Sequence, residues 1–208
     1  MEQKEAYLKD PCRVSSIPYW KAEQFPVPKG VRILHDSEFQ AEDCGLFEDE
    51  PYFRLKHDLQ HLARPCLPPG YSFCSASLRD FAAHISRCYE DIGISEAELQ
   101  SCTARPVYDP ALWIAVKCGA SGELAATGIA ELDRACGEGI LEWIQVSETH
   151  RGRGLGRAVV LELLGRMKGK ACFATVSGRC GNPCRPERLY RSCGFAGNDV
   201  WHVLRRRS

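Results

Sequence analysis

Residues 140–167 read ILEWIQVSETHRGRGLGRAVVLELLGRM, and the apolar periodicity changes once along this stretch. Residues 140–146 are mostly β-branched or apolar, which predicts a strand. In residues 155–167 the apolar positions recur at helical spacing, which predicts a helix with one buried face. A glycine-rich loop, residues 151–156, lies between them. The sequence therefore predicts a strand, a glycine loop and a helix in direct succession.

The loop has the composition of an anion site. It supplies three glycines and, with the next residue, three arginines: Gly152, Gly154, Gly156, Arg151, Arg153 and Arg157. A loop that opens a helix directs backbone N–H groups and the positive end of the helix dipole at one point, which suits a phosphate. It lacks the Lys of the P-loop, and Arg157 stands where the dinucleotide fingerprint needs Gly. A plain glycine-rich turn is the alternative.

The flanking sequence predicts a mixed sheet with helices. Helices are expected at residues 77–90 and 95–102, with Ser77 and Ser95 as N-caps. Further elements are strands at 111–118, 124–133, 171–176 and 199–204, a hairpin at 119–122, and a short helix at 186–193. Strands at 31–35 and 52–59 are expected to pair with each other at a sheet edge. From residue 52 the order is β, α, α, β, β, β, α, β, α, β.

The first 50 residues show no sustained period, and four prolines interrupt them. We expect an ordered wrap without long helices, in which Ile17, Tyr19 and Trp20 pack against the rest of the chain. The sequence therefore suggests an N-terminal extension, residues 1–50, and one α/β domain, residues 51–208.

Composition narrows the class of protein. The 27 basic residues balance 27 acidic ones, which argues against a nucleic-acid partner. A charged N-terminus and the lack of a long apolar run argue against a leader or a membrane span, so we expect a cytoplasmic protein. In that compartment the 12 cysteines are expected to be free thiols. No Cys or His spacing indicates a zinc site, so no metal is expected.

Residues 146–164, VSETHRGRGLGRAVVLELL, resemble the coenzyme A-binding motif of the GNAT (GCN5-related) N-acetyltransferases. That motif is Arg or Gln, two residues, Gly, one residue, and Gly or Ala, which Arg151, Gly154 and Gly156 fill. Val146 matches the family's strand-ending valine. Residues 189–195, LYRSCGF, resemble its second signature, with Tyr190 at the tyrosine position. The resemblance extends over about residues 52–208 and includes the order of the elements.

The resemblance implies a GNAT-type, mostly antiparallel mixed sheet flanked by helices, with a splayed strand pair that forms the coenzyme A site. It implies acetyl-CoA as co-substrate, with pantetheine amides on the backbone of strand 140–146, where it splays from strand 171–176, and pyrophosphate on the loop. The implied cofactor-binding residues are Ile144, Val146, Arg151, Gly152, Arg153, Gly154, Leu155, Gly156, Arg157 and Asn182. Asn182 stands one residue further from Tyr190 than the family's Asn, and a turn role is the alternative.

Acetyl transfer to an amine requires a base, an oxyanion donor and a proton for the leaving thiolate. The resemblance places the oxyanion donor at the N–H near Val146. Tyr190 is the candidate acid, or else a core aromatic residue. Glu142 is the candidate base, because strand alternation would direct it to the face of Ile144 and Val146. Glu131 and Asp133 are rivals, and a solvated role is the alternative for any of them.

The sequence thus predicts an N-acetyltransferase that acts on a primary amine by direct attack in a ternary complex. A small-molecule amine is favoured over a protein as acceptor. The alternatives are a non-catalytic acyl-CoA-binding sensor module and a protein N-terminal or lysine acetyltransferase. His57, His84 and His150 have no spacing that links them to a catalytic partner.

Overall fold

The computed structural model of the chain describes residues 2–15, 27–40, 42–89 and 93–207. The chain divides into two compact units. The terminal unit consists of Met1–His57 and Thr175–Ser208, and the central unit is Asp58–Ala174. Ile17, Tyr19 and Trp20 lie outside the described residues, so their packing stays a prediction. The boundary suggested at residue 50 likewise stays a proposal.

The central unit contains an antiparallel sheet with the strand order β6-β5-β4-β3. The strands are β3 (Tyr71–Cys74), β4 (Trp113–Cys118), β5 (Leu124–Asp133) and β6 (Glu138–Val146). The hairpin predicted at residues 119–122 joins β4 to β5, and the predicted bounds of β5 are confirmed. The edge strand β3 was not predicted, because its four residues are too few to show alternation.

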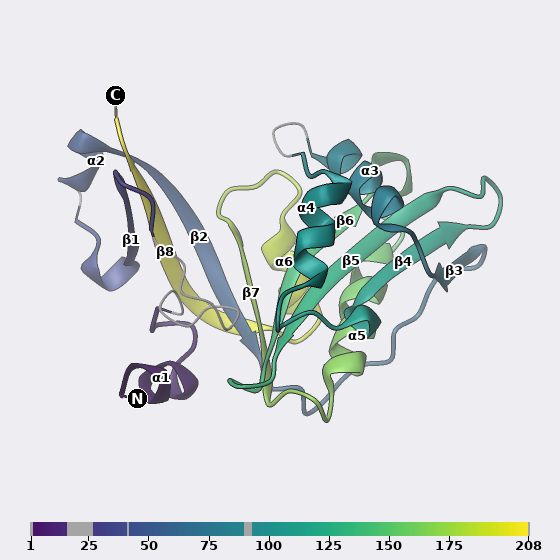
Figure 1. Ribbon diagram of the computed structural model, residues 1–208, viewed down its shortest axis with the longest axis horizontal. Coiled ribbons are helices and arrows are strands. Elements are labelled where there is room, and N and C mark those ends of the chain that lie inside the picture. Colours follow the sequence, from purple (N-terminus) through teal and green to yellow (C-terminus); the bar gives the residue numbers. More distant parts are fainter. Residues whose placement is uncertain (1, 16–26, 41, 90–92, 208) are drawn as a thin grey trace. The chain divides into compact units, whose positions relative to one another are not determined.

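Helices cover both faces of this sheet (Figure 1). On one face α3 (Leu78–Cys88) and α4 (Glu96–Thr103) enclose an apolar cluster with β4 and β5 that includes Phe81, Ile85, Leu99 and Ile129. On the other face lies α5 (Leu155–Met167), whose bounds match the sequence prediction. The predicted caps Ser77 and Ser95 are also confirmed.

Two glycines set how closely α5 lies against the sheet. A Cβ added to Gly128 on β5 would come within 2.4 Å of Val159, and one added to Gly139 on β6 would come within 2.4 Å of Met167. Real Cβ contacts are longer, so a side chain at either position would require Val159 or Met167 to move. The absence of two side chains therefore lets the helix pack closely onto β5 and β6.

In the terminal unit the strands of the sheet lie in the order β1-β8-β2-β7. The strands are β1 (Val31–His35), β2 (Phe47–His57), β7 (Phe173–Arg179), which begins in the central unit, and β8 (Ala196–Arg206). Both β1 and β2 pair antiparallel with β8. The prediction that β1 and β2 pair with each other is therefore wrong: the 11-residue strand β8 lies between them.

The described part of the N-terminal segment packs on this sheet. It contains α1 (Glu2–Lys9), and a short helix α2 (Asp43–Leu46) precedes β2. Tyr7 is fully buried, and its hydroxyl accepts a 2.8 Å hydrogen bond from Arg54, which also donates to the Pro11 carbonyl over 2.7 Å. The Trp201 indole donates to the Cys12 carbonyl over 2.7 Å. Residues 7–12 are thus fixed to β2 and β8.

The predicted fold class, α/β with mostly antiparallel strands and flanking helices, is confirmed. Within the described ranges, each helix is too short or too polar to cross a membrane. The same ranges contain no cluster of three or more His, Cys, Asp or Glu side chains arranged to hold a metal ion.

Candidate active site

Strand β6 carries a β-bulge in its middle. The register pairs Ile129 with Trp143 and Ala130 with Leu141, which leaves Glu142 as an additional residue. Such a residue interrupts the alternation of side chains between the two faces of a strand. Whether Glu142 shares a strand face with Ile144 and Val146 therefore depends on where the observed contacts place the change in alternation.

Those contacts show that alternation reverses once along β6. Gly139 faces Met167 of α5. Ile144 also lies on the α5 face, because a Cβ on Gly128 would meet Ile144 at 3.4 Å together with α5 side chains. Five residues separate Gly139 from Ile144, and an unbroken strand would place them on opposite faces. The reversal therefore lies between Gly139 and Ile144, and the face to which Glu142 points stays a prediction.

The backbone of β6 beyond the bulge is oriented for a ligand along one edge. The Ser147 N–H donates to the Ala125 carbonyl over 2.9 Å, and Ala126 pairs with Val146. In an antiparallel ladder the amides of successive residues point to opposite sides of the strand, so residues two apart point the same way. Those of Ile144 and Val146 therefore point away from β5. The Val146 carbonyl accepts a hydrogen bond from Arg151 Nε at 3.3 Å.

The loop after β6 opens α5 in the predicted way. Gly154 is the N-cap with φ of 80°, and Gly152 has φ of 74°. A left-handed conformation at both positions favours glycine. The first helical bond runs from the Ala158 N–H to the Gly154 carbonyl, and no side chain caps the terminus. A Cβ at Gly152 or Gly154 would meet nothing within 4 Å. The loop thus has open space beside Gly152 and Gly154, at the start of α5.

Arginines surround this terminus. Arg151, Arg153 and Arg157 are all exposed. Arg153 reaches the Thr149 carbonyl at 3.5 Å, at the limit of a hydrogen bond. Within the described part of the chain the Arg157 side chain forms no hydrogen bond or ion pair. Three cations beside an uncapped helix start fit a pyrophosphate, which carries negative charge and many acceptor oxygens.

Tyr190 belongs to the terminal unit, whereas the loop and Glu142 belong to the central unit. It lies on α6 (Pro186–Ser192), is 6% exposed, and packs near Phe53 and Phe195 with ring centroids 6.2 and 5.8 Å away. The helix ends before Gly194, whose φ is 101°, and a Cβ there would lie 2.7 Å from the His57 ring. These contacts fix Tyr190 in its own unit.

Asn182 has a turn role in the structure. Its side-chain oxygen accepts a 2.9 Å hydrogen bond from the Cys184 N–H, and its carbonyl accepts one from the Arg185 N–H. Arg185 has φ of 50°, an uncommon value for a residue other than glycine. A hollow of about 700 Å³ beside α6 is lined by Asn182, Arg185 and Arg188 among others. A cofactor contact by Asn182 stays a prediction.

The rival carboxylates on β5 have structural partners. Asp133 accepts hydrogen bonds from the N–H groups of Ala135 and Cys136 at 2.9 and 3.0 Å, so it shapes the β5–β6 turn. Glu131 is 4% exposed and lies 3.8 Å from Arg105. These contacts favour structural roles for both residues.

Sequence reasoning missed His84, which is fully buried on α3. Its Nδ1 lies 2.9 Å from Thr127 Oγ1 and its Nε2 lies 2.8 Å from Ser147 Oγ. Burial lowers the pKa of His84 to about 4, and the charges of Arg87 and His150 act in the same direction. The partners are 43 and 63 residues away in sequence, so no local pattern indicated them.

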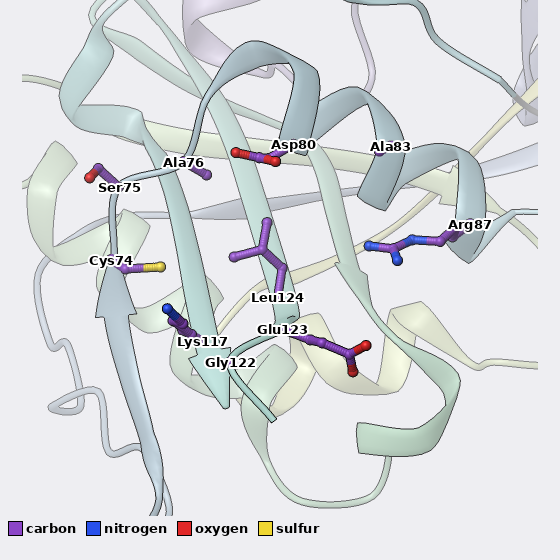
Figure 2. A pocket seen from close by; sticks show the side chains of 10 residues that line it. All are labelled: Cys74, Ser75, Ala76, Asp80, Ala83, Arg87, Lys117, Gly122, Glu123 and Leu124. Atoms are coloured by element: carbon purple, nitrogen blue, oxygen red, sulfur yellow. The ribbon is translucent and has the colours of Figure 1, made fainter. Parts of the chain in front are cut away.

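A groove of about 380 Å³ lies between α3 and the ends of β3, β4 and β5 (Figure 2). Asp80, Ala83 and Arg87 of α3 line one side, and Lys117 and Glu123 lie opposite. Two cations and two carboxylates thus surround one hollow of the central unit. Among the described residues Arg87, Lys117 and Glu123 form no ion pair through their side chains.

Comparison with known proteins agrees with this geometry. The sequence profile described as "Acetyltransferase (GNAT) family" matches residues 56–195, about two thirds of the chain. The chain belongs to the GNAT family. The match includes β6, the glycine loop, α5 and Tyr190.

One curated relative is glucosamine 6-phosphate N-acetyltransferase 1 of Oryza sativa subsp. japonica, 35% identical over 88 residues. The match covers 39% of this chain and half of the length of that relative. Two solved structures show the same fold. A GCN5-related N-acetyltransferase from Sphaerobacter thermophilus has a TM-score of 0.69 at 17% identity, over 86% of this chain and 61% of that one. An acetyltransferase of the GNAT family from Novosphingobium aromaticivorans has a TM-score of 0.57 at 15% identity, over 89% and 72%.

Proposed function

We propose that this GNAT chain is an N-acetyltransferase that moves the acetyl group of acetyl-CoA to a primary amine of a small molecule. The observation that carries the proposal is the start of α5, which follows β6 through an exposed glycine loop and has no side-chain cap. An N-terminus of this kind binds phosphate. The named activity of the rice relative supports a small amine as acceptor.

We assign cofactor binding to the loop and to the edge of β6. The N–H groups of residues 152–157 would hold the pyrophosphate, with Arg151, Arg153 and Arg157 adding charge. The outward backbone groups around Ile144 and Val146 would pair with pantetheine, and the Val146 N–H would lie at the thioester carbonyl. The orientation that the β5–β6 ladder imposes on these two residues supports this assignment.

We assign the chemistry to three groups of the chain. Acetyl-CoA supplies an activated acyl thioester, which a neutral amine attacks directly. The Val146 N–H would stabilise the oxyanion, and Glu142, at the bulge, would accept the amine proton. Tyr190 would protonate the thiolate, since a phenol pKa near ~10 lies close enough to the ~8.5 of a thiol for the transfer.

The test measures acetyl-CoA binding first and coenzyme A release second. Acetyl-CoA at about 100 times its Kd should stabilise the fold by about 2.7 kcal/mol and raise Tm. Gly154→Glu should abolish this shift, because it places a carboxylate at the phosphate site. Gly165→Glu is the matched control: it adds the same charge at an exposed position near the other end of α5. An equal shift in both variants would contradict the loop assignment.

Coenzyme A release should then be measured with a panel of amines that includes glucosamine 6-phosphate, amino acids, polyamines and peptides. Release with a small amine supports the proposal. Binding without release against any amine would favour a non-catalytic acyl-CoA sensor. Release only with peptides would favour an acetyltransferase for protein N-termini or lysines.

A further inference from the structure

In the central unit a continuous series of hydrogen bonds connects α3 with β5 and with the end of β6. His84 bonds to Thr127 through Nδ1 and to Ser147 through Nε2. Ser147 Oγ donates to the Leu124 carbonyl over 3.1 Å, and the Gln145 amide donates to Thr127 Oγ1. His84 and Thr127 are fully buried. These hydrogen bonds therefore link the side chains of three separate elements.

The donor and the acceptor of each hydrogen bond in this series follow from the Leu124 carbonyl at its end. A carbonyl only accepts, so the Ser147 hydroxyl donates to Leu124 and accepts from His84 Nε2–H. A neutral imidazole has one N–H, so Nδ1 accepts from the Thr127 hydroxyl. The lowered pKa of His84, which burial causes, keeps the ring neutral at pH 7. The ring is therefore held in one tautomer and one orientation.

Ser147 occupies a position that matters for the phosphate loop. It is the first residue after β6 and the N-cap of the short turn Glu148–His150, which leads into Arg151. Serine at such a position commonly caps its own turn. Here the side chain makes no cap bond and instead bonds to His84 and Leu124. Its hydroxyl therefore ties the start of the loop segment to α3.

The far end of the same segment is held in a similar way. His150 Nδ1 lies 2.9 Å from the Tyr71 hydroxyl on β3, with the two rings at 89°. Residues 147–150 are thus anchored at both ends by side chains that lie outside the loop. His84 holds the end next to β6, and Tyr71 holds the end next to Arg151.

We propose that His84 is a positioning residue for the phosphate-binding loop, and that its hydrogen bond to Ser147 sets where the N–H groups of residues 152–157 stand. The inference rests on the proposed function, because it concerns binding of the pyrophosphate. A ligand without pyrophosphate should not depend on this bond. That difference separates a positioning role from a purely structural one.

The test compares His84→Gln with His84→Asn on two ligands. A Gln side chain can place its amide N–H where Nε2 lies and keep the bond to Ser147, whereas Asn reaches only the position of Nδ1. We expect Kd for acetyl-CoA to rise roughly tenfold in His84→Asn relative to His84→Gln, equivalent to about 1.4 kcal/mol. Kd for S-acetylpantetheine, which lacks the pyrophosphate, should be equal in both. Calorimetry below the Tm of each variant measures this.

A second pair of variants tests the same hydrogen bond without changing the buried histidine, in case the histidine variants do not fold. Ser147→Ala removes the acceptor and should weaken acetyl-CoA selectively, whereas Ser147→Thr keeps a hydroxyl and should stay near wild type. Equal acetyl-CoA affinities within both pairs would overturn the inference, as would equal weakening of both ligands. A wild-type chain that binds neither ligand would instead overturn the proposed function, and this inference with it.

Discussion

Helices α3 and α5 of the central unit begin in opposite ways. At α3 the Ser77 hydroxyl accepts from the Asp80 N–H over 3.1 Å, and the Asp80 carboxylate accepts from the Ser77 N–H over 3.1 Å. At α5 the N-cap is Gly154, with no side-chain bond. Capping satisfies the first N–H groups and leaves little for a ligand. Its absence leaves them for an anion, and helix α4 repeats the capped design with Ser95 and Glu98.

The largest expected effect comes from adding an internal anion to α5. Arg157 occupies the third helical position, which Glu98 occupies in α4. Arg157→Glu should weaken acetyl-CoA binding at least about 100-fold, since it replaces a charge-assisted contact with repulsion. The free energy of unfolding should not fall, because a carboxylate in the first turn interacts favourably with the helix dipole. Calorimetry and thermal unfolding measure both quantities.

The matched variant is Glu98→Arg, which breaks the capping box of α4. It should lower stability by about 1 kcal/mol and leave the Kd for acetyl-CoA unchanged. If Glu98→Arg weakened acetyl-CoA as much as Arg157→Glu, the contrast between the helix termini would carry no functional meaning.

Helix α6 also has no side-chain cap, but it starts with a proline, which has no N–H to offer to an anion. We therefore assign no anion binding to α6, and the role proposed for this helix is acid catalysis by Tyr190. Tyr190→Phe should lower kcat about 100-fold, the small end of the range for general acids, with unchanged Kd for acetyl-CoA. Single-turnover rates with an active amine measure the step. An unchanged rate would leave Tyr190 as a core aromatic residue.

A smaller effect is expected from the conformation of Gly154. The position has room for a side chain but a left-handed backbone. Gly154→Val should cost about 1–2 kcal/mol of stability and raise Kd for acetyl-CoA roughly tenfold as the loop shifts. Gly154→Asn is the control, since Asn tolerates this conformation. Similar losses in both variants would show that space, and not backbone conformation, limits the position.

The smallest effect is a difference in acid sensitivity. Hydrogen bonds from Ser77 and Ser95 lower the pKa of Asp80 and Glu98 below their ordinary values of 3.8 and 4.5. A lowered folded-state pKa gives stability that is present above the ordinary value and is lost as pH falls through the folded value. Wild type should therefore lose more stability than Glu98→Gln between about pH 5 and about pH 3. Parallel losses in chemical denaturation would contradict this.

Local pattern was enough to predict α5 and β5, because an uninterrupted apolar period of 3.6 or a long β-rich run specifies each. The glycine loop was predicted equally well, because its residues are adjacent in the sequence. The bulge at Glu142 was not, because it depends on the register with β5 rather than on β6 alone. The same holds for His84, whose partners come from β5 and from the residue after β6. Sequence spacing thus gives elements and motifs, whereas tertiary contacts decide which side chains meet.

The close packing of α5 has a consequence for how this chain can vary. A methyl group at Gly128 would meet Val159 at 2.4 Å, and one at Gly139 would meet Met167 at 2.4 Å, so either change requires a helix side chain to move. In a library of random variants codon 128 should vary less than codon 139, because Val159 is stiff whereas the end of Met167 is flexible. Compensation would need a smaller residue at 159 or 167 in the same molecule. Variation at these four positions should therefore occur in pairs, one from the sheet and one from the helix.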